Sequence, residues 1–198
     1  MGADAQTDSA INQATQQAFA QWSAITGLHF QQAQDPAQAD IQINLGDFNT
    51  AETGIIGYTG YNIQAGQFTS GTAITIEDPN ETALITNAQG TLQYTGTEAT
   101  LAQVLLHEIG HALGFAANAD AHSIMDYALT ANNQTFDDTD IIGAENVYHA
   151  TAPGLNISAA NHLVQAMSTF GVEPAASTST TNPNEIDNHQ NSILAVNH

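Results

Sequence analysis

Two histidines stand four residues apart inside an apolar segment, and this spacing strongly constrains how the segment can fold. His107 and His111 are separated by Glu108, Ile109 and Gly110. In an α-helix, residues i and i+4 lie one turn apart on the same face, so both imidazoles would point the same way. Leucine, isoleucine and alanine residues flank the pair, which favours a helix over a loop. The pattern therefore predicts a helix that presents two metal-binding nitrogens on one stripe.

The glutamate after the first histidine completes a chemical pattern. Zinc is commonly bound by histidine nitrogens, and it lowers the pKa of a bound water to about 7. The Glu108 carboxylate could take a proton from this water, which makes hydrolysis of an unactivated bond feasible near neutral pH. Histidine pairs with this spacing also occur by chance. Taken alone, the pentapeptide leaves open a helix face with an incidental glutamate.

The ends of this helix can also be predicted. Thr97 or Thr100 is expected to cap its N-terminus, and Glu98 is expected early in the helix, where the helix dipole favours an acidic residue. Gly114 is expected to end the helix, because a residue without a Cβ readily adopts the left-handed conformation needed for a sharp turn.

A methionine-containing segment follows at a short distance and makes the pattern more specific. The sequence HEIGHALGF at residues 107–115, followed by SIMDY at residues 123–127, resembles the metzincin zinc metallopeptidases. The distance between the two segments is similar to that in the serralysin and matrixin branches of this group.

The resemblance implies a role for each matching residue. His107 and His111 would bind zinc, Glu108 would be the general base, Met125 would lie beneath the histidines, and the Tyr127 hydroxyl would stabilise the oxyanion. The alternatives for the last two are that Met125 fills core and that Tyr127 is a half-buried aromatic residue.

One position departs from the family pattern. The third zinc-binding histidine would fall at Ala117, whose methyl group cannot bind a metal. Asp120 and His122 are candidate replacements, and His122 would reach the metal only if the loop took another path. Alternatively, the site has two protein ligands plus water, or the alanine has been introduced in place of a histidine. Glu145 would be the ligand in a scheme like that of thermolysin, although the segment around it more closely resembles a closing helix that packs.

The charge balance limits the partners of this chain. It has 20 Asp and Glu residues, no Lys or Arg, and a formal net charge of −20. Without groups that neutralise phosphates, we expect no nucleic-acid binding and no attraction to anionic membranes. No stretch is long and apolar enough for membrane insertion. The expected partner is a protein or peptide substrate, and the chain is assumed to be monomeric.

Clustered carboxylates without basic partners must be solvated, cap helices or bind cations. Calcium favours several oxygen ligands, so residues 137–140 and 78–81 are candidate Ca²⁺ sites. For residues 137–140 we favour a helix N-terminus, where aspartates accept hydrogen bonds from free amides.

The absence of cysteine removes disulfides, thiolate metal sites and the cysteine-based latency switch of matrixin propeptides. This composition resembles that of serralysin-like proteins, although their glycine- and aspartate-rich calcium repeats are absent. We therefore expect a secreted, extracellular protein from a bacterium. The N-terminal segment shows no charged-then-apolar signal sequence, so export would require a leader that has been removed or a C-terminal signal.

Periodicity along the rest of the chain predicts an α+β fold. Residues 8–26 are expected to form a helix that Asp8 caps and Gly27 ends. The strands expected from alternating apolar residues are 28–31, 40–45 and 72–76. His29 is expected on the surface. The resemblance implies that residues 54–61, rich in glycine and tyrosine, lead to a sheet edge that lines the substrate cleft. The alternative is a loop whose tyrosines pack.

This order of elements resembles the metzincin (zincin-like) fold. That fold has a twisted mixed sheet, a long N-terminal helix, a zinc-site helix and a C-terminal closing helix. The predicted domain covers residues 1–150, with an upper subdomain of about 1–114 and a lower one of about 115–150. Residues 151–198 would add a helix and a polar tail, with residues 173–192 as linker or tail.

These observations predict a zinc-dependent endopeptidase, serralysin- or matrixin-like, whose activity Ala117 impairs. The alternative is a catalytically impaired metzincin fold that serves as a binding or surface module. A third possibility is a calcium-stabilised structural domain of a large secreted adhesin.

Overall fold

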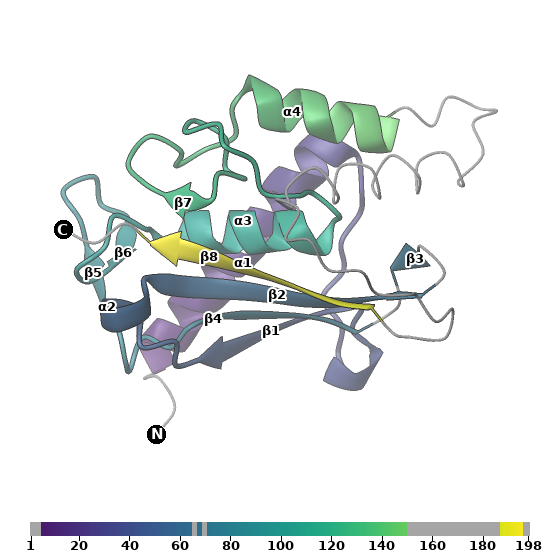
Figure 1. Cartoon of the computed structure of the whole chain (residues 1–198). Coiled ribbons are helices and arrows are strands. Elements are labelled where there is room, and N and C mark those ends of the chain that lie inside the picture. The colour runs from purple at the N-terminus through teal and green to yellow at the C-terminus, as the bar shows by residue number, and fades with distance from the viewer. Residues whose placement is uncertain (1–4, 65–66, 69–70, 150–186, 196–198) are drawn as a thin grey trace, which may run out of the picture.

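A long helix opens the fold and forms one wall of the core (Figure 1). The computed structural model describes residues 5–64, 67–68, 71–149 and 187–195. Helix α1 spans Ala5–Thr26, so it begins before the predicted cap, and Asp8 lies in its first turn instead. Gly27, with a φ of 72°, follows its last residue as predicted. One face of α1 is apolar and is buried or packed against the core: Ile11, Ala14, Ala18, Trp22 and Ile25.

The main sheet is mixed, and six strands contribute to it: β1 (Ile41–Gly46), β2 (Ile55–Gln64), β3 (Gln67–Phe68), β4 (Thr72–Glu77), β7 (Ala128–Leu129) and β8 (Asp187–Ala195). Their order is β1-β4-β2-β8-β7, and β3 pairs with β2. β1 is parallel to β4, and β2 is antiparallel to both β4 and β8. The strands predicted at 40–45 and 72–76 are therefore confirmed, and residues 54–61 belong mostly to a strand rather than a loop.

Two predictions about strands were wrong. Residues 28–31 have no regular secondary structure. Phe30 packs against Phe19 of α1 at 4.9 Å between ring centroids, so the apolar alternation there reflects packing on the helix. Residues 187–192, predicted as part of a polar tail, belong to β8. The rest of that segment and the helix predicted between Ser158 and Gly171 lie outside the described residues.

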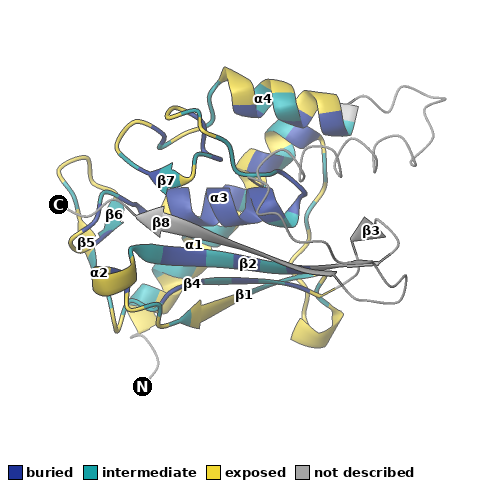
Figure 2. Cartoon of the chain, in the orientation of Figure 1, coloured by how far each residue is buried: buried dark blue, intermediate teal, exposed yellow. Residues whose placement is uncertain are grey.

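The remaining elements are short except for the helix that carries the histidine pair: η1 (Pro36–Gln38), α2 (Thr50–Thr53), β5 (Leu84–Thr86), β6 (Leu92–Tyr94), α3 (Leu101–Ala112), α4 (Asp138–Ala144) and η2 (Glu145–His149). β5 and β6 form a separate two-stranded sheet. Figure 2 shows that α3 is buried along nearly its whole length, between α1 and the sheet on one side and the loops that lead to α4 on the other. The helix with the two histidines is therefore the centre of the core.

The closing helix packs as expected. Ala144 and Val147 are buried, and the Tyr148 hydroxyl donates a hydrogen bond to the Leu113 carbonyl at 2.5 Å, just after α3. This contact ties the last helical turn of the domain to the end of the histidine helix. No helix in the described part of the chain is long and apolar enough to cross a membrane.

Candidate metal centre

Both ends of α3 are fixed by local hydrogen bonds. Thr100, one of the two predicted caps, forms a capping box with Gln103: its hydroxyl accepts from the Gln103 N–H at 3.2 Å, and the Gln103 side chain accepts from the Thr100 N–H at 2.9 Å. Gly114, at φ 93°, follows the helix as predicted. The prediction for Glu98 was wrong. It lies before the helix, and its carboxylate accepts from the Ala131 N–H at 3.0 Å.

The two histidines are buried on one face of α3, with their ring centroids 4.5 Å apart. The Nδ1 of His107 lies 2.8 Å from the Ile124 carbonyl, and the Nδ1 of His111 lies 2.7 Å from the Phe115 carbonyl. A carbonyl can only accept, so both Nδ1 atoms carry the proton and donate. Each Nε2 therefore keeps its lone pair for a metal ion, which is the usual arrangement of histidine ligands.

Burial also favours the neutral form of both imidazoles. It holds the pKa of His107 well below its usual range, and the neighbouring His111 lowers it further. Burial lowers the pKa of His111 to about 4. Since a metal binds the neutral imidazole, protons compete weakly with a metal at this site near neutral pH.

Glu108 is fully buried beside the pair. Its Oε2 accepts a 2.5 Å hydrogen bond from the Thr59 hydroxyl of β2, and its Oε1 has no hydrogen-bond partner. A Cβ at Gly57 would lie 2.5 Å from Oε1, so β2 can approach this closely only with glycine there. Burial raises the Glu108 pKa to about 8, and the Thr59 hydrogen bond opposes the rise.

Sequence reasoning did not single out Thr59 or Gly57 as site residues. A glycine inside a strand-like segment can indicate close approach of another group, and that was the available signal for Gly57. A threonine in a strand carries no such signal.

Met125 is buried, and its sulfur lies against Gly110 of α3. A Cβ at Gly110 would collide with the Met125 sulfur and with the Trp22 ring. The methionine and the indole therefore fill the space where a larger residue would otherwise stand. The place beneath the zinc-binding histidines, which the family resemblance implied for Met125, stays a prediction.

Asp140 of α4 holds the segment that contains this methionine. Its Oδ1 accepts from the Ser123 hydroxyl at 2.6 Å, and its Oδ2 accepts from the Ile124 N–H at 2.8 Å. Asp140 also forms a capping box with Asp137, the N-cap of α4. The helix-cap interpretation of residues 137–140 is thus confirmed, and Asp140 has a positioning role that sequence reasoning missed.

The comparison with known families agrees with this geometry. A family model for the matrixins, Peptidase_M10, matches residues 3–149. The chain belongs to the matrixin family. This membership confirms the metzincin fold that the histidine and methionine segments indicated, and it identifies the metal of the family as zinc. No curated protein matches the chain.

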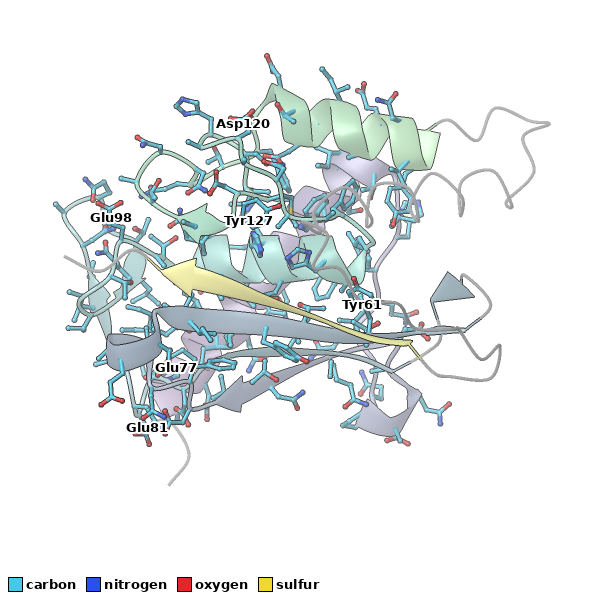
Figure 3. All side chains as sticks on the ribbon, viewed as in Figure 1. Tyr61, Glu77, Glu81, Glu98, Asp120 and Tyr127 are labelled. Carbon is cyan, nitrogen blue, oxygen red and sulfur yellow. The ribbon has the colours of Figure 1, made fainter. Side chains whose placement is uncertain are left out.

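Catalytic zinc sites usually have three protein ligands, and the described residues bring no third one to the histidine pair. No group of three or more His, Cys, Asp or Glu residues forms in the part of the chain that the structure describes. His122 is exposed, and its N–H donates to Asp120. Asp120 also accepts from Thr139 and lies near the start of α4 (Figure 3). Ala117 is half-buried in the loop after α3, and Glu145 is exposed.

The second candidate calcium segment forms an ordinary turn. Asp78 accepts from the backbone N–H of Asn80 at 2.9 Å and from its side-chain amide at 2.7 Å. The Asp78 carboxylate is therefore stabilised by hydrogen bonds within the turn, which do not require a cation. Calcium binding remains a prediction.

The residues present fit a zinc ion held by two histidines. A zinc ion would bind the two available Nε2 atoms. A water on that ion would give the buried Glu108 oxygen the hydrogen bond that it lacks. Tyr127 is 49% exposed, two residues beyond the buried methionine and next to β7 (Figure 3). About half of its surface is therefore open to solvent, and its role at the oxyanion stays a prediction.

Proposed function

We propose that this matrixin domain is a zinc-dependent endopeptidase that hydrolyses peptide bonds in proteins or peptides, of the serralysin/matrixin type. One observation carries the proposal. Both Nδ1 atoms are held by backbone carbonyls, so two Nε2 lone pairs remain available beside a buried glutamate oxygen that has no partner.

Each group has a part in this chemistry. Zinc, when bound, supplies Lewis-acid polarisation and lowers the pKa of water. Glu108 accepts the proton of the attacking water and passes it to the leaving amine. Its raised pKa suits a group that both takes and gives a proton near neutral pH. The Tyr127 hydroxyl donates a hydrogen bond to the oxyanion that develops on the peptide carbonyl.

We further propose that Ala117 weakens this site. If a structural zinc site contributes about 10–16 kcal/mol, one of four ligands contributes roughly 3 kcal/mol. Its loss would weaken zinc binding by about two orders of magnitude. The site would still fill at generous zinc concentrations, and looser positioning of the reacting groups would slow turnover.

Metal analysis combined with proteolysis tests the proposal. The purified chain, incubated with excess zinc and desalted, should hold about one zinc per molecule by elemental analysis and should cleave casein. Glu108→Gln should keep the zinc and lose the cleavage. Glu145→Gln, at an exposed position of the same residue type, is the matched control and should change neither. A chain that binds no zinc would refute the proposal.

The second candidate is a catalytically impaired matrixin fold that serves as a binding or surface module. The absence of a third ligand among the described residues favours it. Zinc binding without cleavage of casein, at a zinc concentration that fills the site, would support this module. We also propose a secreted, extracellular location, which the lack of cysteine and of basic residues supports.

A further inference from the structure

Strand β2 lies directly beside the carboxylate of Glu108, the proposed general base. Thr59 of this strand bonds Glu108, and Gly57 makes room for its second oxygen. β4 pairs with one edge of β2. The other edge would be free to hold an extended peptide by main-chain hydrogen bonds, as exposed sheet edges do in many complexes.

That edge is already paired by this chain's own C-terminal segment. β8 runs antiparallel to β2, from Ile63↔Asp187 to Ile55↔Leu194. On its other side, β8 runs parallel to β7, with Ala128↔Leu194 and Leu129↔Ala195. Figure 1 shows β8, in yellow, crossing between β2 and the histidine helix α3.

The register places β8 across the proposed catalytic groups. Thr59 and Gly57, which flank the Glu108 carboxylate, pair with Asn191 and Ile193. Leu194 pairs with Ala128, the residue after Tyr127. The backbone from 191 to 194 thus spans the interval between the Glu108 side of the site and the Tyr127 side.

We propose that residues 187–195 are a substrate-like strand that docks in the peptide cleft of its own domain and blocks it. The inference rests on the proposed function in one respect, because only that function makes the edge of β2 the substrate cleft. An extended peptide must displace β8 to reach β2. The matrixin match ends at residue 149, so this strand is an addition to the family domain.

Tethering makes the block effective although the strand is short. A segment covalently joined to its site acts at an effective concentration on the order of 1 mM. If the free strand bound with a Kd of about 0.1 mM, the tethered strand would weaken a competing peptide about tenfold. The pairing is made by the backbone, so side-chain replacements in β8 should matter less than loss of its N–H groups.

Single prolines in the full chain test this pairing. In an antiparallel pair, alternate residues exchange hydrogen bonds with the partner strand. Of the neighbours Asn191 and Ser192, one therefore donates its N–H to β2, and proline there removes that bond. Asn191→Pro and Ser192→Pro are compared with Asn191→Ala and Ser192→Ala, which keep both N–H groups.

Amide hydrogen exchange of β2, measured by mass spectrometry, is the first readout. At least one proline variant should speed exchange of the β2 amides that face β8 by about tenfold or more, and the alanine variants should match the unaltered chain. Exchange of β1 and β4 reports whether each variant is folded. Equal β2 exchange in all folded variants would overturn the proposal.

Peptide binding is the second readout. It keeps the proposal testable if one of the proline variants fails to fold. A fluorescent peptide of sequence DNHQNSILA should bind the more affected proline variant about tenfold more tightly than the unaltered chain, and a scrambled peptide should not discriminate. Equal binding to both proteins would contradict the docked strand. Neither readout needs zinc or hydrolysis, so failure of the peptidase proposal would be seen separately.

Discussion

The carboxylate of Asp140 accepts a hydrogen bond from the backbone N–H of Ile124 at 2.8 Å. The carbonyl of the same Ile124 accepts from the His107 ring at 2.8 Å. One peptide segment therefore connects an acidic residue at the start of α4 to a predicted zinc ligand on α3. The orientation of the His107 ring depends on a residue that does not touch it.

Replacing Asp140 tests this connection. Asp140→Ala should leave the Ser123 hydroxyl and the Ile124 N–H without their partner, which costs about 2–4 kcal/mol of folding stability. Because His107 loses a fixed carbonyl, zinc affinity should fall about 10- to 100-fold. Chelator competition and urea unfolding measure the two effects. Asp138→Ala, at an exposed position in the same turn, should change neither, and equal effects of the two substitutions would rule out the connection.

The packing at Gly110 predicts a large effect from one methyl group. Gly110→Ala would push against the Met125 sulfur and the Trp22 ring. The methionine can shift, but the indole is held by its hydrogen bond to the Leu106 carbonyl and by stacking on Phe115. We expect a net loss of about 1–3 kcal/mol, although alanine is the better helix former.

Gly143 of α4 is the matched control for this substitution. A Cβ there would meet only Phe115, at an ordinary contact distance of 3.9 Å. Gly143→Ala should therefore be neutral or add up to about 1 kcal/mol. By calorimetry, the melting temperature of Gly110→Ala should fall below that of the unaltered chain, and the melting temperature of Gly143→Ala should stay the same or rise. Similar melting temperatures would show that Gly110 is not tightly packed.

Glu108 should make the metal-free protein less stable as pH rises. Its folded pKa of about 8 lies above the value of 4.5 expected when unfolded, so the folded state holds the proton more tightly. The Glu108 contribution to stability should be greatest below pH 4.5 and fall between 4.5 and 8, by roughly 4 kcal/mol if the whole shift is realised. The buried neutral histidines act in the opposite direction, because their lowered pKa values cost stability as pH falls. Urea unfolding in a chelator, at several pH values, measures this decline.

The isosteric Glu108→Gln variant isolates this titration from all other groups. It keeps the shape of the side chain and has no proton to lose, so its stability should fall less over the same pH range. The difference between the two proteins is the contribution of Glu108. Parallel stability curves would mean that the carboxyl is not buried as the structure shows.

Restoring the family's third histidine should strengthen the metal site. Ala117→His should raise zinc affinity by about two orders of magnitude, because one added ligand contributes roughly 3 kcal/mol. Competition with a chromogenic chelator measures the affinity, and casein cleavage at saturating zinc shows whether positioning improves as well. Ala116→His, one residue earlier, is the control. An unchanged affinity would indicate that the loop does not direct position 117 toward the pair.

Local patterns predicted the parts of this fold that depend on local physics. The four-residue spacing of the histidines, the glycines at 27 and 114, and the alternation at 40–45 and 72–76 all gave elements that the structure contains. The common face of the two histidines followed from the helix period alone. These features need no knowledge of what packs against them.

Features that depend on a distant partner could not be predicted in the same way. The Thr59 hydrogen bond to Glu108 joins residues 49 positions apart, and nothing near Thr59 indicates it. The pairing of β8 with β2 is made by backbone groups, which every residue except proline carries. Residues 28–31 alternate like a strand but pack on α1 instead.

The single tryptophan of the chain, Trp22, is fully buried against helix α3. Its indole stacks on the Phe115 ring, with 4.9 Å between ring centroids. Phe115 also supplies the carbonyl that receives the His111 hydrogen bond. Tryptophan fluorescence of this protein therefore comes from one known place, and the ring on which the indole stacks belongs to the residue that receives the hydrogen bond of His111, a predicted zinc ligand. If the site binds zinc as proposed, we expect uptake and release of the ion to change this emission, so binding can be followed in real time without attaching any dye.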